Sequence, residues 1–428
     1  MPTRRLTVHV TATERHPSGE RLLAALRAAG MSAVPARFSI ATVRQEIPEA
    51  VLAGIEGFIR LFDQVTSRPA WREVATASAP EIARSPRSEV CFFSAWDFHL
   101  PPGRPEGWQL IEFNDNGSGI LFSALVNRLF WEHCDLDRPG RLAAPPAYPA
   151  FAERVANMIE HEARAFFGRM PDGLFLIVDD ADSLRAGRFH DELVLLRELV
   201  RRRGWNAAIA APAELCWKSD QLLVDGREVS FVINRSTDFF FEAEVLAALR
   251  AAYRAGRVYV APNPFSYATR SDKALLAFLS SADSDARLGI RPEERAVLTA
   301  HVPATRVVRE EDVERIAAQR DELVVKPTHG YAGRGLLDRS QVGRSRLRRL
   351  LRTGVSYVAQ QRVPKARLMT EGDTELWADL RIWAYRGQCF LASGRASRHP
   401  DRIDLAPPGG WLPTYVRPAQ ETPPVRPP

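Results

Sequence analysis

Residues 324–335 read Val-Val-Lys-Pro-Thr-His-Gly-Tyr-Ala-Gly-Arg-Gly. An apolar run ends in a lysine and is followed by three glycines, which predicts a strand, a glycine-rich loop and a second strand over residues 321–337. Glycines free backbone amides to surround phosphate oxygens, and a compact ammonium adds a point charge. We therefore interpret Lys326, Gly330, Gly333 and Gly335 as a candidate phosphate-binding element.

Lysine is rare in this chain. Only four of its 58 basic residues are lysines, namely Lys218, Lys273, Lys326 and Lys365. A planar guanidinium cannot replace a compact ammonium at every phosphate site, so a lysine kept in such a composition can mark one. Lys326 fits because of its glycine loop, whereas Lys218 and Lys365 are interpreted as chance lysines.

The glycine loop differs from two common nucleotide-binding motifs. It lacks the Gly-Lys-Ser/Thr of a Walker A motif, and no helix opens directly after it as in a Rossmann fingerprint. Taken alone, it also fits a plain hairpin connection. The motifs on either side of the loop are needed to distinguish a phosphate-binding loop from a plain hairpin connection.

The length and composition of the chain limit the classes of protein to which it can belong. A chain of 428 residues should hold two or three domains, since single cores rarely exceed roughly 250 to 300 residues. With 45% hydrophobic and 26% charged residues it is typical of a soluble globular protein. No apolar run approaches the ~18 residues of a membrane span, and no signal-like apolar core opens the chain. Its four scattered cysteines indicate buried thiols in a reducing compartment, so we expect a cytoplasmic protein with no membrane partner.

The charge is basic but diffuse. A formal net charge of +6 and a pI near 9.3 invite a nucleic-acid interpretation. The excess forms no patch with interleaved aromatics, and runs such as 201–203 and 344–352 are typical of solvated helix faces. Nucleic acid is therefore not an expected partner.

Hydrophobic periodicity divides the chain into segments. Residues 1–88 are predicted to be mostly helical, and residues 417–428 to be a disordered, proline-rich tail. Between them we expect a β-hairpin, helices and then strands that alternate with helices, which favours an α/β fold with a parallel sheet. The expected bounds are a hairpin over 90–114, helices over 120–133, 152–167 and 191–203, strands over 174–178 and 207–210, and a short hairpin over 221–231.

Further motifs surround the glycine loop. Asn263-Pro264-Phe265 is followed by Asp272-Lys273, which places the second lysine at a predicted helix start. Downstream, residues 357–363 form a strand-like stretch in which Gln360 could hydrogen-bond a purine edge. This order of parts resembles the ATP-grasp superfamily, in which two lysines contact the nucleotide phosphates and a hinge strand holds adenine. The resemblance gives these roles to Lys273, Lys326 and Gln360, although Gln361 stands where the hinge usually has an acid.

The metal residues of that superfamily, a Glu-x-Asn pair, normally follow the hinge, but here Glu112-Phe113-Asn114 precedes the lysines. Residues two apart on a strand share a face. A turn centred between Arg104 and Pro105 would place Asp97 opposite Glu112. Asp97, Glu112 and Asn114 would then offer oxygen ligands suited to Mg²⁺. The alternative is a hairpin with exposed acids on its solvent face.

This order of parts resembles the circularly permuted ATP-grasp proteins of the glutathionylspermidine synthetase type. The resemblance covers residues 90–415 and implies an α/β (α+β) ATP-grasp fold in circularly permuted order. Residues 89–170 would carry the metal hairpin, 171–261 a Rossmann-like pre-ATP-grasp domain, and 262–416 the nucleotide-binding lobes. An arginine often found two positions before the aspartate is replaced by Ala95, which indicates a substrate other than glutathione.

The resemblance implies an ATP- and Mg²⁺-dependent carboxylate-amine ligase that forms an acyl phosphate. Arg381 and Arg395 are the candidate catalytic cations, and Gly330–Gly335 would close as a flap against water. The carboxylate and amine substrates, small molecules or peptides, are not identified by the sequence, and neither is the oligomeric state. Two alternatives stay open: an ATP-grasp phosphotransferase or nucleotide-binding protein without turnover, and a module that binds anionic partners.

Overall fold

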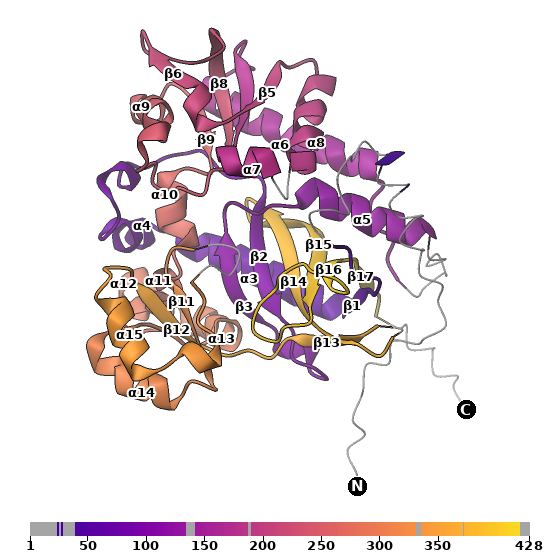
Figure 1. The fold of residues 1–428 in the computed structure, drawn as a ribbon, viewed down its shortest axis with the longest axis vertical. Coiled ribbons are helices and arrows are strands. Elements are labelled where there is room, and N and C mark those ends of the chain that lie inside the picture. The colour runs from indigo at the N-terminus through magenta and orange to yellow at the C-terminus, as the bar shows by residue number, and fades with distance from the viewer. Residues whose placement is uncertain are drawn as a thin grey trace.

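The computed structural model describes residues 39–133, 142–186, 190–330, 335–370 and 372–419, together with residues 24, 27 and 28. Gly333 of the glycine loop and residues 420–428 of the predicted tail lie outside the described residues. The fold is a mixed α/β arrangement of three main sheets with helices around them (Figure 1). No helix in the described ranges is long and apolar enough to cross a membrane.

The large sheet occupies the centre of the molecule (Figure 1). Its antiparallel strands follow the order β16-β15-β14-β2-β3, and β13 also pairs with β14. The segment that follows β12 lies in the same sheet as the hairpin, because β14 pairs with β2. The bounds are β2 (Ser94–His99), β3 (Gln109–Asn114), β13 (Ala366–Met369), β14 (Glu375–Tyr385), β15 (Gln388–Ser397) and β16 (Gly410–Leu412).

The N-terminal helices cover one face of the large sheet. In α3 (Glu49–Thr66) the buried residues follow helical spacing, among them Ile55, Phe58 and Phe62, and they pack with Trp96 of β2 in one hydrophobic cluster. Helix α4 (Pro69–Thr76) adds Trp71 to that cluster. The described part of residues 1–88 contains these helices and also a strand.

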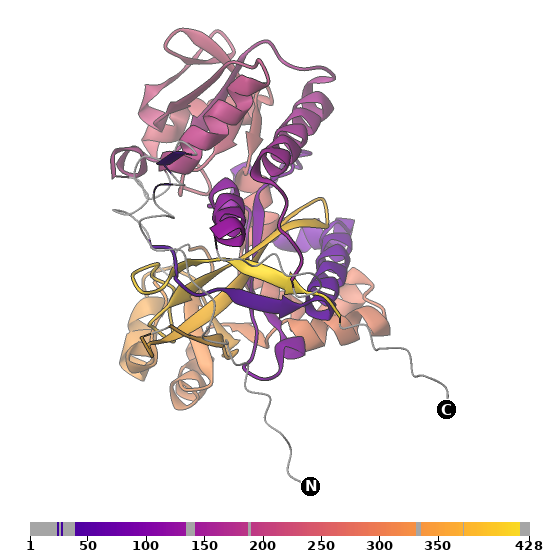
Figure 2. The same cartoon turned by 90° about the vertical axis from the view of Figure 1, so that its right-hand side faces the viewer.

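That strand ties the two ends of the described chain together. The strand β1 (Gln45–Pro48) runs parallel to β17 (Thr414–Arg417), and Figure 2 shows the two side by side. Because β1 and β17 pair, the segment that precedes α3 is packed against the segment that follows the large sheet in the chain.

The parallel sheet forms the upper lobe in Figure 1. Its strand β4 has the sequence Leu-Phe-Leu-Ile-Val and is buried throughout, which is typical of a strand covered on both faces. Parallel strands follow the order β5-β4-β8-β9, while β7 pairs antiparallel with β8 and β6 pairs antiparallel with β7. The bounds are β4 (Leu174–Val178), β5 (Ala207–Ala210), β6 (Leu215–Lys218), β7 (Gln221–Val224), β8 (Arg227–Asn234) and β9 (Tyr259–Ala261).

Helices flank this sheet and join it to the large sheet. One hydrophobic cluster contains side chains from α5, α6 and α8, from β4 and from Trp383 of the large sheet. The helices are α5 (Ile120–His133), α6 (Tyr148–Phe167), α7 (Ala181–Ala186), α8 (His190–Arg202) and α9 (Ala247–Ala255). The bounds of β4, β5 and α5 are those predicted from the sequence, and α6 begins four residues earlier than expected.

The small sheet lies in the lower left lobe of Figure 1. Its central strand β12 (Tyr357–Gln361) pairs antiparallel with β10 (Thr305–Val307) and β11 (Leu323–Pro327). The second strand predicted after the glycine loop is reduced to one bridge between Val325 and Leu337. The surrounding helices are α10 (Pro264–Ser266), the π-helix η5 (Tyr267–Ser271), α11 (Ala274–Leu279), α12 (Asp283–Leu288), α13 (Pro292–His301), α14 (Val313–Ala318) and α15 (Arg344–Leu351). Short 3₁₀ turns complete the described elements: η1 (Glu81–Ala83), η2 (Pro105–Gly107), η3 (Pro212–Glu214), η4 (Glu244–Leu246), η6 (Glu310–Asp312) and η7 (Arg339–Gln341).

Candidate active site in the cavity between the sheets

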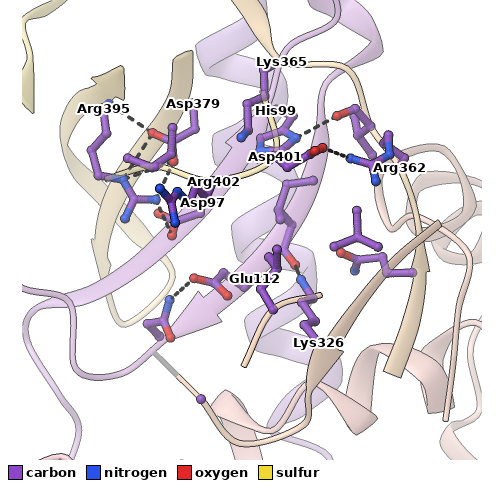
Figure 3. Close-up of a pocket in the computed structure, with 18 of the residues that line it drawn as sticks. Asp97, His99, Glu112, Lys326, Arg362, Lys365, Asp379, Arg395, Asp401 and Arg402 are labelled. Carbon is purple, nitrogen blue, oxygen red and sulfur yellow. Dashed lines mark hydrogen bonds and ion pairs between the residues drawn. The ribbon is translucent and has the colours of Figure 1, made fainter. Parts of the chain in front are cut away.

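A cavity of about 1110 Å³ lies where the three sheets meet. Most of the side chains that sequence analysis selected line it, and Figure 3 shows several of them pointing toward one another. Those that line it are Asp97, Glu112, Asn114, Lys326, Gly330, Gln360, Arg381 and Arg395. The sequence therefore predicted residues that the fold does bring together.

The hairpin of β2 and β3 supplies the oxygen-bearing side chains. Asp97 is paired with Glu112 across the two strands, which confirms the predicted register, and a bulge follows between Asp97 and Phe98. Asn114 Nδ2 donates to Glu112 Oε1 at 3.0 Å, so the two side chains lie on one face. Their role as metal ligands stays a prediction.

Two lysines converge on Glu112 from the small-sheet lobe. Lys326 Nζ donates to the backbone oxygen of Ile111 at 2.9 Å. Lys273, directly before α11, places Nζ 3.0 Å from the oxygen of Gly330 and 3.5 Å from Glu112 Oε2. Burial lowers the pKa of Lys326 to about 8, although Glu112 opposes this change. Burial would raise the pKa of Glu112, but Lys273 and Lys326 hold it below its ordinary value.

Two arginines enclose the third oxygen-bearing side chain. Arg381 binds Asp97 in a bidentate pair, with Nε to Oδ1 and Nη2 to Oδ2 each at 2.7 Å. Arg395 Nη2 donates to the same Oδ2 at 2.9 Å and also to Asp379 Oδ2. Burial would raise the pKa of Asp97, but the two guanidiniums outweigh it and lower that pKa.

The described glycines of the loop have distinct environments. Gly330 accepts the hydrogen bond from Lys273 and lines the cavity. Gly335 has a φ of +74°, and a Cβ there would lie 3.2 Å from the Pro327 ring. A residue with a side chain is strained in that backbone conformation, so glycine is favoured at position 335.

Gln360 lies in the middle of the small sheet rather than at its edge. The side chain is buried, and its Nε2 donates to Thr305 Oγ1 at 3.2 Å while the residue lines the cavity. The backbone that follows β12, through Arg362 and Val363, also lines the cavity. The role of Gln360 beside a base stays a prediction.

Lys365 lies in the cavity wall and sequence analysis missed it by interpreting it as a chance lysine. Its buried Nζ donates to the backbone oxygen of Pro400 at 2.8 Å. Burial lowers the pKa of Lys365 to about 8, against the effect of Asp379. Burial and then Lys365 lower the pKa of the nearby His99 to about 3, which keeps that imidazole neutral. The scarcity of lysine was the signal that could have identified Lys365.

The charge of the cavity favours anionic ligands. Ten lining residues are lysines or arginines and seven are aspartates or glutamates. Arg235, at the end of β8, and Arg306, in β10, extend the cationic lining toward the other two sheets. A concave surface with this excess raises the local concentration of anions.

The donor set has the chemistry of a site for a hard cation. Two carboxylates and one amide oxygen suit Mg²⁺. Within the described ranges, no three side chains of His, Cys, Asp and Glu form a metal-binding group. The predicted set instead combines Asp97, Glu112 and the amide of Asn114, and the two oxygens of Asp97 are held by arginines. These residues would fit Mg²⁺ if an arginine moved away from the Asp97 carboxylate.

Comparisons with known proteins place the fold. Neither a scan against known protein families nor a search of curated protein sequences finds a match. Among solved structures, a glutathione synthetase-like effector from Globodera pallida in its apo form aligns with a TM-score of 0.58 at 9% identity, over 94% of this chain and 98% of that chain. Two further structures align with lower scores. A putative gamma-glutamylcysteine synthetase from Methylobacillus flagellatus KT gives 0.48 at 12% identity over 85% and 88% of the two chains, and the ATP-grasp ligase PsnB with its minimal precursor gives 0.30 at 17% over 57% and 89%.

The fold of this chain is therefore similar to that of a glutathione synthetase-like protein, and the likeness extends over nearly the whole chain.

Proposed function

We propose that the protein is an ATP- and Mg²⁺-dependent carboxylate-amine ligase that acts through an acyl phosphate. The observation that carries this proposal is that Lys326, the acidic hairpin and two arginines line one cavity, and that Lys273 lies 3.5 Å from Glu112 of that hairpin. The hairpin precedes the lysines in the chain, which supports a circularly permuted order. The parallel sheet of residues 171–261 would then be the Rossmann-like pre-ATP-grasp domain, between the metal hairpin in 89–170 and the nucleotide lobes in 262–416.

In this proposal ATP binds with its base beside β12 and its phosphates beside the two lysines. Gln360 and the following backbone would hydrogen-bond the base. Lys326 and Lys273 would hold the phosphate oxygens, and Gly330 to Gly335 would cover them. Both ammonium groups already lie near Glu112, so phosphates that reach them also reach the hairpin.

Glu112, Asn114 and Asp97 would hold Mg²⁺. When bound, this ion neutralises phosphate charge that the protein's cations do not cover. The hairpin contributes rigidity to this task, because the backbone register fixes Asp97 opposite Glu112.

The reaction makes and breaks one bond at each of two steps. A substrate carboxylate oxygen attacks the γ-phosphorus of ATP, a C–O–P linkage forms, and the bond between the β- and γ-phosphates breaks with release of ADP. An amine then attacks the acyl carbon, an amide forms, inorganic phosphate leaves, and the nitrogen loses a proton. Arg381 and Arg395 would orient the carboxylate and stabilise the transferring phosphoryl group.

The carboxylate substrate would enter from the side of the parallel sheet. The cavity continues there to Arg235 and Thr237, which follow β8, and to Asp179, which follows β4. A cationic wall favours an acidic small molecule or peptide as substrate. The amine would approach from the same side.

The test is acceptor-dependent ADP release. The intact chain is incubated with ATP, Mg²⁺ and mixtures of carboxylic acids and amines, and ADP and amide products are measured together. A ligase releases ADP only with acid and amine present and forms amide. Phosphorylated product without amide would instead favour a phosphotransferase, and nucleotide binding without ADP release under any mixture would contradict catalysis.

A further inference from the structure

Arg395 is shared between two buried carboxylates. Its Nη2 donates to Asp97 and to Asp379, while its Nε lies 3.1 Å from Asp379 Oδ2 and its backbone N–H donates to Asp379 Oδ1 at 3.0 Å. Asp379 and Arg395 are also paired across β14 and β15. The guanidinium therefore has one contact with Asp97 and several with Asp379.

The contacts of Asp97 are divided differently. Arg381 holds both of its oxygens in a bidentate pair across β14 and β2. Arg395 contacts only Oδ2. Oδ2 of Asp97 thus accepts two hydrogen bonds, one from Arg381 and one from Arg395. Arg395 also contacts a second carboxylate, that of Asp379.

A cation at Asp97 and Glu112 would be repelled by both Arg381 and Arg395, and an arginine cannot lose its charge to relieve this repulsion. Moving a partly buried guanidinium is costly unless another carboxylate receives it. Of the two arginines, Arg395 is the one for which the structure shows a second carboxylate in contact. Asp379 is 2% exposed and already in contact, so it meets this requirement without a large rearrangement.

Resting on the proposed function, we propose that Asp379 is a positioning residue that receives Arg395 when Asp97 exchanges this arginine for Mg²⁺. In the structure described here, Asp97 is in its arginine-bound form. Without Asp379, Asp97 is the remaining carboxylate partner that the structure shows for Arg395, and the guanidinium would stay on it. When Arg395 leaves, Oδ2 keeps the hydrogen bond from Arg381, and the lone pair that Arg395 occupied becomes available to the cation.

The test is a double-mutant cycle on metal affinity rather than on turnover. Mn²⁺ is titrated into the intact chain at saturating non-hydrolysable ATP analogue, and bound Mn²⁺ is followed by electron paramagnetic resonance. Asp379→Asn should weaken Mn²⁺ binding by about 10- to 100-fold, the range for residues that orient metal ligands. In the presence of Arg395→Gln, the same Asp379→Asn change should have little effect, because the competing guanidinium is gone.

The other possible results of this experiment would contradict either the role of Asp379 or the proposed function. Arg395→Gln alone should bind Mn²⁺ at least as tightly as the unchanged chain, and weaker binding would contradict the proposal even if Asp379→Asn failed to fold. A loss with Asp379→Asn that persists beside Arg395→Gln would indicate a merely structural role. If the unchanged chain bound no Mn²⁺ with the analogue, the proposed function itself would fall, and this inference with it.

Discussion

Burial disfavours the charged form of Lys326, and a bound nucleotide phosphate would favour that form again. Its ammonium is buried, and burial lowers its pKa from 10.5 to about 8. A bound phosphate favours the charged form and raises this pKa again. The scarcity of lysine in the chain helped to identify Lys326 from the sequence. The same scarcity applied to Lys365, which was nevertheless interpreted as a chance lysine.

This residue predicts a pH dependence of ATP binding. Above about pH 8, free Lys326 is increasingly neutral, so binding has to take up a proton and the affinity falls as pH rises. Calorimetric titrations of ATP in buffers of different ionisation enthalpy measure this uptake. Lys326→Arg, which keeps its charge, should lose the part of the proton uptake that Lys326 causes, while Lys365, whose pKa is also lowered to about 8, can account for what remains. Equal proton uptake by this variant and the unchanged chain would contradict the assignment.

The pairs around Asp97 show what sequence alone could not supply. Arg381 and Arg395 were chosen because the chemistry needs cations there, and the structure adds that both already bind Asp97. Residues so far apart in the chain meet only through the pairing of β14 with β2 and β15. No local pattern encodes that contact, and Asp379 was missed for the same reason.

At the scale of elements, the hairpin was the most predictable part of the site. Alternating side chains and a turn-rich loop were enough to place Asp97 opposite Glu112. The strand after the glycine loop was less predictable, because among its described residues the pairing is a single bridge between Val325 and Leu337. Backbone pairing at that point depends on the rest of the lobe rather than on the glycines.

Helix α6 is fixed to two sheets by one buried glutamate. Glu162 Oε2 accepts hydrogen bonds from Val90 N at 3.1 Å and Tyr259 Oη at 3.3 Å, and Oε1 accepts from Tyr385 Oη at 2.5 Å. The partner Arg386 is 44% exposed, so that ion pair contributes little. The buried hydrogen bonds carry most of the stabilisation.

Glu162→Ala should therefore lower the free energy of unfolding by about 3 kcal/mol, because buried donors lose their acceptor. Urea unfolding followed by tryptophan fluorescence measures the change. The matched control is Glu153→Ala on the same helix, where the 54% exposed side chain pairs with Arg203 and should cost less than about 1 kcal/mol. Equal effects of the two changes would contradict the role of Glu162.

At the scale of the whole molecule, the ends of the chain complete the central sheet region. Sequence analysis set residues 1–88 apart as a helical segment, but β1 pairs with β17 and α3 packs under β2. Helical spacing indicated that α3 buries one face. It could not indicate which surface covers that face, since the partner strands lie in other segments.

Deletion of residues 1–88 should consequently prevent folding rather than remove a separate domain. The truncated chain would expose the aromatic cluster around Trp96 and leave β17 unpaired. Solubility and thermal melting followed by circular dichroism test this expectation. A truncated chain that melts cooperatively and binds ATP would show that the segment is dispensable.

We propose that the large sheet and the small-sheet lobe act together, because the hairpin of the large sheet would hold the metal that serves the nucleotide lysines of the small-sheet lobe. Calorimetric titration of ATP into the intact chain, with and without Mg²⁺, tests this most directly when repeated on the Glu112→Ala, Asn114→Ala double variant. We predict that Mg²⁺ tightens ATP binding to the intact chain and that the double variant loses this enhancement. Equal binding by both proteins with and without Mg²⁺, or no binding by either, would contradict the metal hairpin and favour a protein that binds anionic partners without catalysis.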